Sequence, residues 1–157
     1  MSEARIQALS EAYNQLKEAV EGLSPQQLAW KQSPEVWSVK EVLTHLADHL
    51  IVVSFRIRDI LAGTGKTLPV FSQDSWITGQ HANEGETEDV FEAYGALLRY
   101  NARLLQRLTP QDWEKKGINA KGEEVSITEI VRLFAAHVQN HLGQIGRMKQ
   151  ALAAAAV

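Results

Sequence analysis

The sequence predicts an all-α protein, a four-helix bundle with a long crossover connection between the second and third helices. Three observations support this. Apolar residues recur every three or four positions in four long segments, capping residues precede several of these segments, and alternating strand patterns are nearly absent. Helices of about 20 residues, each with one apolar face, bury those faces best against one another. We expect one such domain over residues 1–157.

The first predicted helix covers residues 4–23, where apolar side chains fall on one helical face. Gly22 lies near its end and is a typical stop signal. Ser24 and Pro25 follow directly, a helix cap and a residue favoured at the first helical position. They indicate one short turn of helix before the second long segment.

The second predicted helix covers residues 39–61, and it begins with a capping box formed by Ser38 and Glu41. Glycines and a proline end it. The next segment, residues 63–85, has no clear period, so we expect a loop. Loops of this length in a compact domain are often functional. This loop also permits the crossover topology.

The third predicted helix covers residues 87–108, and "TPQDW" at 109–113 repeats the signal of a cap followed by proline. The segment "KGEEVS" at 121–126 indicates a turn or a small hairpin. The fourth helix begins with a second capping box, Ser126 and Glu129, and we expect its alanine-rich end to fray.

Composition excludes several classes of function. The net charge of −3 does not favour nucleic-acid binding, and the absence of cysteine excludes disulfides, a thiolate nucleophile and a cysteine metal site. No apolar stretch is long enough to span a membrane, and the charged N-terminus does not resemble a signal peptide. We therefore expect a cytoplasmic protein without membrane or nucleic-acid partners.

Four of the five histidines form two pairs, His45 with His49 and His137 with His141. Residues four apart share one face of a helix, so two imidazoles at this spacing can converge on one metal ion. Both pairs flank the apolar stripe of their helix, where residues can line a cleft between helices. The fifth histidine, His81, is expected to be a solvated loop residue.

The spacing does not decide which residue of the upstream pair is the third ligand. Catalytic zinc commonly takes three protein ligands and keeps one position open. Both His45 and His49 are candidates on geometry alone. The sequence "HVQNH" at 137–141 lacks the glutamate of the "HExxH" motif, so a zinc-protease activity is not expected.

The two blocks "PEVWSVKEVLTHLADHL" and "AHVQNHLGQI", taken together, resemble the DinB-like (damage-inducible) superfamily. Their order and separation make the resemblance fairly specific, and it spans most of the chain. One departure is Leu50, near which many relatives carry a glutamate. The matching residues are Trp37, Ser38, Glu41, His45 and Leu46 in the first block, and His137, His141 and Gln144 in the second.

The resemblance implies a four-helix bundle that holds a divalent metal ion, often zinc or nickel, through His45, His137 and His141. It also implies frequent homodimers and a relation to S-transferases and isomerases that use a low-molecular-weight thiol. We therefore expect a metal-dependent enzyme that acts on small molecules, with a thiol as a possible cosubstrate. The alternatives are a stress-associated metal-binding or ligand-binding homodimer without activity, and a bundle whose histidines only pack.

Other residues near these motifs have expected roles of their own. Glu41 either orients His45 or only completes the capping box, which we favour. Asp48 is expected to be an exposed carboxylate, and Gln144 is expected to bind substrate or to pack at the end of the bundle. Trp76 either forms a wall of the pocket or plugs the bundle. Trp30 and Trp37 are expected in the core, and Arg99, Arg103 and Arg107 are expected to form a solvated ridge.

Overall fold

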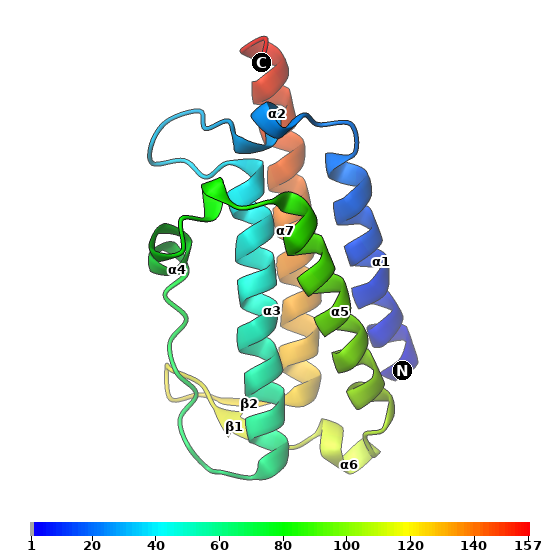
Figure 1. The fold of residues 1–157 in the computed structure, drawn as a ribbon. Coiled ribbons are helices and arrows are strands. Elements are labelled where there is room, and N and C mark those ends of the chain that lie inside the picture. Colours follow the sequence, from blue (N-terminus) through cyan, green and yellow to red (C-terminus); the bar gives the residue numbers. More distant parts are fainter. Residues whose placement is uncertain (1) are drawn as a thin grey trace.

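Four long helices lie side by side in the computed structural model, which describes residues 2–157 (Figure 1). α1 packs against α5 and α7, and α3 packs against the same two helices, so the four close a ring. The predicted all-α bundle is confirmed. The bundle helices are α1 (Ser2–Val20), α3 (Val39–Ala62), α5 (Thr87–Gln106) and α7 (Ile127–Ala154).

The crossover between α3 and α5 is confirmed, because these neighbouring helices run in the same direction (Figure 1). The chain must therefore return along the bundle over residues 63–86. We predicted a loop over residues 63–85, but this segment is not a continuous loop. It contains α4 (Gln73–Gly79) and the 3₁₀ turn η1 (Ala82–Glu84). α4 has only about two turns, too few for a repeating apolar pattern to be recognised.

The capping motifs form as their sequences indicate. The Ser38 hydroxyl accepts the Glu41 N–H at 3.1 Å, and the Glu41 carboxylate accepts the Ser38 N–H at 3.0 Å. Two short helices begin with the same reciprocal arrangement: α2 (Pro25–Ala29) after Ser24 and α6 (Pro110–Trp113) after Thr109. Each capped start satisfies amides that the helix itself leaves free.

Only half of the second predicted capping box is present. The Ser126 hydroxyl accepts the Glu129 N–H at 3.1 Å, but the Glu129 carboxylate pairs with Arg132 instead. The predicted hairpin precedes this start, with β1 (Lys116–Ile118) antiparallel to β2 (Glu124–Ser126). The alanine-rich end that we expected to fray stays helical to residue 154.

α3 is the most deeply buried helix of the bundle, and its buried residues continue around most of its circumference. Because α3 contacts α5 and α7 as well as α2 and α4, side chains beside its apolar stripe are also covered. His45 is one of these, at 1% exposure. The core side chains with the least exposure include Val42, Leu46, Leu50, Ile57, Leu105, Ile127, Val138 and Ile145.

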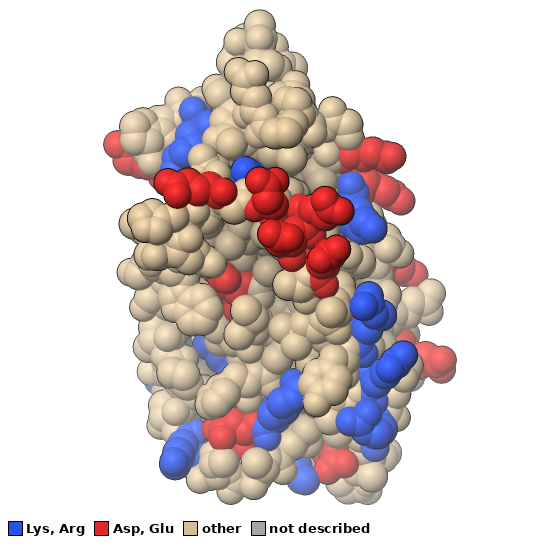
Figure 2. All heavy atoms as spheres, viewed as in Figure 1, with Lys and Arg blue, Asp and Glu red and all other residues tan. Residues whose placement is uncertain are grey.

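Acidic side chains gather over the N-terminal end of α5 (Figure 2). They include the exposed Glu84, Glu88 and Asp89. Since α3 and α5 are parallel, their positive dipole ends lie at the same end of the bundle, where negative charge is favourable.

The predicted arginine ridge on α5 is exposed. Among residues 2–157, every helix falls short of the length and apolarity that crossing a membrane requires.

Gly95→Ala is expected to destabilise the bundle by about 1–3 kcal/mol despite the better helix propensity of alanine. A Cβ there would lie 2.7 Å from the Tyr13 hydroxyl oxygen. Tyr13 cannot move aside easily, since it stacks on Tyr94 and donates to the Phe91 carbonyl oxygen. The matched control is Gly146→Ala, where a Cβ meets nothing within 4 Å. Urea unfolding of both variants measures the difference, and equal stabilities would contradict this close α1–α5 contact.

Candidate metal centre

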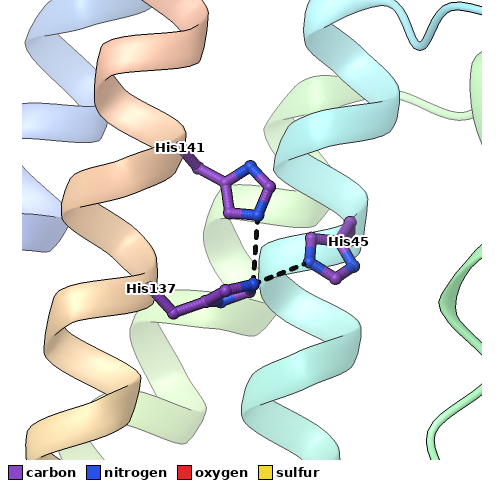
Figure 3. Close-up of side chains that lie close together, drawn as sticks. All are labelled: His45, His137 and His141. Carbon is purple, nitrogen blue, oxygen red and sulfur yellow. Dashed lines mark hydrogen bonds between the residues drawn. The ribbon is translucent and has the colours of Figure 1, made fainter.

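Three histidine side chains from two antiparallel helices point toward one another (Figure 3). His45 comes from α3, and His137 and His141 come from α7. The Nε2 atom of His137 lies 3.2 Å from Nε2 of His45 and 3.1 Å from Nε2 of His141. His137 is therefore the middle member of the cluster.

The spacing of these nitrogens fits a divalent metal ion. Nitrogens that each lie about 2.0–2.1 Å from one ion are about 3.3–3.4 Å apart in tetrahedral geometry and about 2.8–3.0 Å apart in octahedral geometry. One ligand atom from each histidine lies within 4.8 Å of the other two. The three imidazoles can thus hold one ion, and their separations suit either geometry.

Gln144 fixes the orientation of one of these rings. Its Oε1 atom lies 2.7 Å from Nδ1 of His141. Because an amide oxygen only accepts, His141 must carry its proton on Nδ1, which leaves the Nε2 lone pair free toward the cluster. This contact adds an orienting role to the two that we considered for Gln144, substrate binding and packing at the end of the bundle.

Gln144→Ala is expected to weaken metal binding by about 10–100-fold without abolishing it, as is typical for partners of metal-binding histidines. Without the amide oxygen, His141 can turn or change tautomer. Gln150→Ala is the matched control, because Gln150 is an exposed residue of the same helix. A competition titration with a chromophoric chelator gives both dissociation constants, and indistinguishable values would rule out this orienting role.

Burial keeps the clustered imidazoles neutral. Desolvation, with smaller contributions from neighbouring histidines, lowers the pKa of His45 to about 3 and that of His137 to about 4. Desolvation also lowers the pKa of His141. Neutral rings present lone pairs near pH 7, as metal binding requires. Among residues 2–157, the Nδ1 atoms of His45 and His137 have no hydrogen-bond partner.

Aromatic rings surround His45. The Trp37 ring lies 5.0 Å from it between centroids, and Phe71 stacks on it at 5.7 Å. Trp37 is partly buried and packs against the core, as predicted in part, and it also lies beside the cluster. Trp30, which was also predicted in the core, is only partly buried. We did not single out Phe71 in the sequence, because no spacing relates a loop residue to a distant helix.

A pocket of about 340 Å³ opens beside the cluster. His45, His49 and His137 line it together with Phe71. Its remaining lining residues include Asn140 and the apolar Leu133. This space can receive a small molecule next to the imidazoles.

His49 lies beside the three clustered histidines, but none of its ring nitrogens belongs to the group that could hold a metal ion. Its ring stands edge-on to His137 at 4.3 Å between centroids and packs against Phe134 at 5.4 Å. Desolvation lowers its pKa to about 3. Of the two candidates in the upstream pair, the structure brings His45 into the cluster and leaves His49 as part of the pocket wall.

The carboxylates near the cluster face other partners. Glu41 completes the capping box and forms an ion pair with Lys31 at 2.9 Å, which agrees with the role we favoured. We expected Asp48 to be exposed, but it is buried. It is 5% exposed and accepts a hydrogen bond from the Gln80 side chain at 2.6 Å. Gln80 belongs to the crossover, so burial of Asp48 depends on a contact between distant segments.

The structure decides between the two roles predicted for Trp76 and agrees with the position predicted for His81. Trp76 is 40% exposed and meets Phe71 edge-on at 5.1 Å, so it supports the pocket wall from outside and does not plug the bundle. His81 is exposed and has a φ of 53°, in agreement with a solvated loop position.

The sequence matches the family model of the DinB superfamily over residues 8–145. The chain belongs to the DinB superfamily. Its resemblance to this superfamily, first suggested by the two histidine blocks, is thereby confirmed. The match includes all three histidines of the cluster.

Two relatives of this DinB protein are named as candidate metal-dependent hydrolases. One, from Oceanobacillus iheyensis, is 25% identical over 136 residues, which are 84% of this chain and 76% of the relative. Another, from Bacillus licheniformis, is 29% identical over 140 residues, which are 87% of this chain and 78% of the relative.

Two solved structures share the DinB bundle. YfiT from Bacillus subtilis, described as a probable metal-dependent hydrolase with an unusual four-helix bundle topology, superposes with a TM-score of 0.88 at 21% identity. The alignment covers 97% of this chain and 87% of YfiT. A mycothiol-dependent maleylpyruvate isomerase superposes with a TM-score of 0.75 at 12% identity, over 93% of this chain and 61% of the isomerase. At these identities the likeness establishes the fold.

Proposed function

We propose that this protein is an enzyme that uses one divalent metal ion, zinc or nickel, held by His45, His137 and His141, to act on a small molecule. The observation that carries the proposal is the convergence of three Nε2 atoms beside a pocket of about 340 Å³. When bound, such an ion supplies a Lewis acid that lowers the pKa of a thiol or a water molecule and polarises a carbonyl.

The reaction that we propose is the transfer of a low-molecular-weight thiol to an electrophile. The thiol loses its proton to solvent, its sulfur bonds to an electrophilic carbon, and the leaving group departs with the electron pair of the broken bond. The chain contains no cysteine, so the thiol has to be a cosubstrate. The likeness in fold to a mycothiol-dependent isomerase supports this choice.

Hydrolysis is the second candidate, because the relatives at 25% and 29% identity are named as candidate hydrolases. A metal-activated water commonly uses a carboxylate as its base. Glu41 is occupied by the capping box and Lys31, and Asp48 accepts its hydrogen bond from Gln80. These contacts favour thiol transfer, since a thiol needs less help to ionise than water does.

The residues of the pocket have separable roles in this proposal. Gln144 orients His141, and burial keeps the imidazoles unprotonated. Trp37 and Phe71 cover His45 and exclude water from it. We further propose that the protein forms homodimers, which the resemblance implied.

The test begins with the metal content of untagged protein, followed by a panel of thiols with electrophiles and a panel of esters. We expect about one divalent ion per chain and thiol transfer that His45→Ala abolishes. His81→Asn is the control, because His81 is exposed and asparagine tolerates its positive φ. Bound metal without turnover would instead support a non-catalytic binding protein, and the absence of both metal and activity would support histidines that only pack.

A further inference from the structure

A second hollow, of about 160 Å³, adjoins the histidine pocket and contains one charged side chain, that of Arg56. α3 and α7 form most of its walls with apolar residues, and Leu68 of the crossover and Asn119 and Val125 of the hairpin region complete them. The two hollows share His49 and Leu133. The two hollows therefore lie next to each other along α3 and α7.

Arg56 has no acidic partner in the part of the chain that the structure describes. The ion pairs of residues 2–157 involve other side chains. The Nη2 atom of Arg56 donates to the Pro69 carbonyl oxygen at 3.3 Å, while its Nε atom is buried without a partner. A partly buried cation with an unused donor, in a mostly apolar hollow, is costly unless an anion neutralises it.

Arg56 and the histidines lie along one face of α3. His49, Val53 and Arg56 follow His45 in successive steps of four, four and three residues, which keep side chains on one face. At 1.5 Å per residue, the Cα atoms of His45 and Arg56 are about 16 Å apart. Helical side chains lean toward the N-terminus, so the long Arg56 side chain can cover part of this distance.

We propose that Arg56 binds a terminal carboxylate of the substrate whose reacting group lies at the histidine cluster. This inference rests on the proposed function and names its substrate class: an elongated thiol or electrophile with an apolar body and a carboxylate at the far end. The guanidinium fork of arginine matches the two oxygens of a carboxylate. Val53, Leu133 and Phe134 contact the apolar body between the two ends.

The experiment compares two thiols of equal length, 6-mercaptohexanoate and 6-mercaptohexanol, on the protein loaded with Co²⁺. Charge-transfer absorption from sulfur to cobalt reports binding of the thiol end alone. We expect the carboxylate thiol to bind about 10–100-fold more tightly, the range for a hydrogen bond to a charged group. Arg56→Gln should remove this difference and leave the affinity for 6-mercaptohexanol unchanged.

Two further variants control for charge and fold. Arg56→Lys keeps the charge without the fork, so it should retain only part of the preference. Arg103→Gln removes a positive charge from an exposed position on α5 and should retain all of it. Equal affinities of the wild-type protein for the two thiols would overturn the inference and leave the proposed function intact.

A different result, no charge-transfer band with either thiol, would count against thiol binding at the metal, and therefore against the proposed function. The carboxylate site is then decided on the metal-free wild-type protein by following the Arg56 Nε–H signal in nuclear magnetic resonance spectra. Hexanoate should shift this signal and hexanol should not. If neither shifts it, the carboxylate site is refuted independently of the metal.

Discussion

His137→Ala is expected to abolish stoichiometric binding of a divalent ion. The Nε2 atom of His137 lies between those of His45 and His141, at 3.2 and 3.1 Å. Without it, one imidazole from each helix remains, and two ligands hold an ion much more weakly than three. The loss should exceed the roughly 10–100-fold effect of removing a partner of a ligand.

The matched variant is His49→Ala. It removes an imidazole whose ring centroid lies 4.3 Å from that of His137, and it leaves the three histidines of the cluster in place. It should keep one ion per chain. Elemental analysis after dialysis gives the stoichiometry, and circular dichroism of both metal-free variants verifies the fold. Equal metal retention by the two variants would refute the ligand set that we propose.

The metal-free protein is expected to lose stability steeply as the pH falls from about 6.5 to about 4. Burial lowers the pKa of His45 and His49 to about 3 and that of His137 to about 4, from 6.5 in the unfolded chain. In this window the unfolded state binds protons that the folded state does not. Stability is therefore complete above pH 6.5 and declines below it.

Three protons would give a slope of about 4 kcal/mol per pH unit, and the partial exposure of His49 and His137 reduces this to about 2–3. Urea unfolding of chelator-treated protein across this pH range measures the slope. His49→Phe should make it shallower, because it removes one of the imidazoles whose pKa burial lowers, whereas His81→Asn should not change it. Identical slopes for wild type and His49→Phe would contradict the burial of this imidazole in the folded state.

Local signals in the sequence predict most of the fold. The capping box at Ser38 and the cap followed by proline at Thr109 depend on residues at most three positions apart, so they can be read directly. The long crossover follows from the length of the segment between two helices. α4 could not be predicted in this way, since seven residues are too few for a helical period.

In the site, as in the fold, the sequence predicts what local spacing determines and misses what depends on tertiary contacts. The spacing of His137 and His141 places them on one face of a helix, but only tertiary packing or family resemblance selects His45 over His49. Asp48 was mispredicted because its burial requires Gln80, which lies 32 residues later in the chain. Phe71 and Arg56 act through neighbours that are distant in sequence, and no local pattern marks them.

The cluster joins α3 to α7 across 92 residues of chain, measured from His45 to His137. During synthesis, a chain still attached to the ribosome therefore has only its upstream histidine pair until the last helix has emerged. A complete ligand set arises only when α7 docks against α3. Uptake of the ion would then report that assembly has finished, and chains cut short before α7 would be unable to compete for metal.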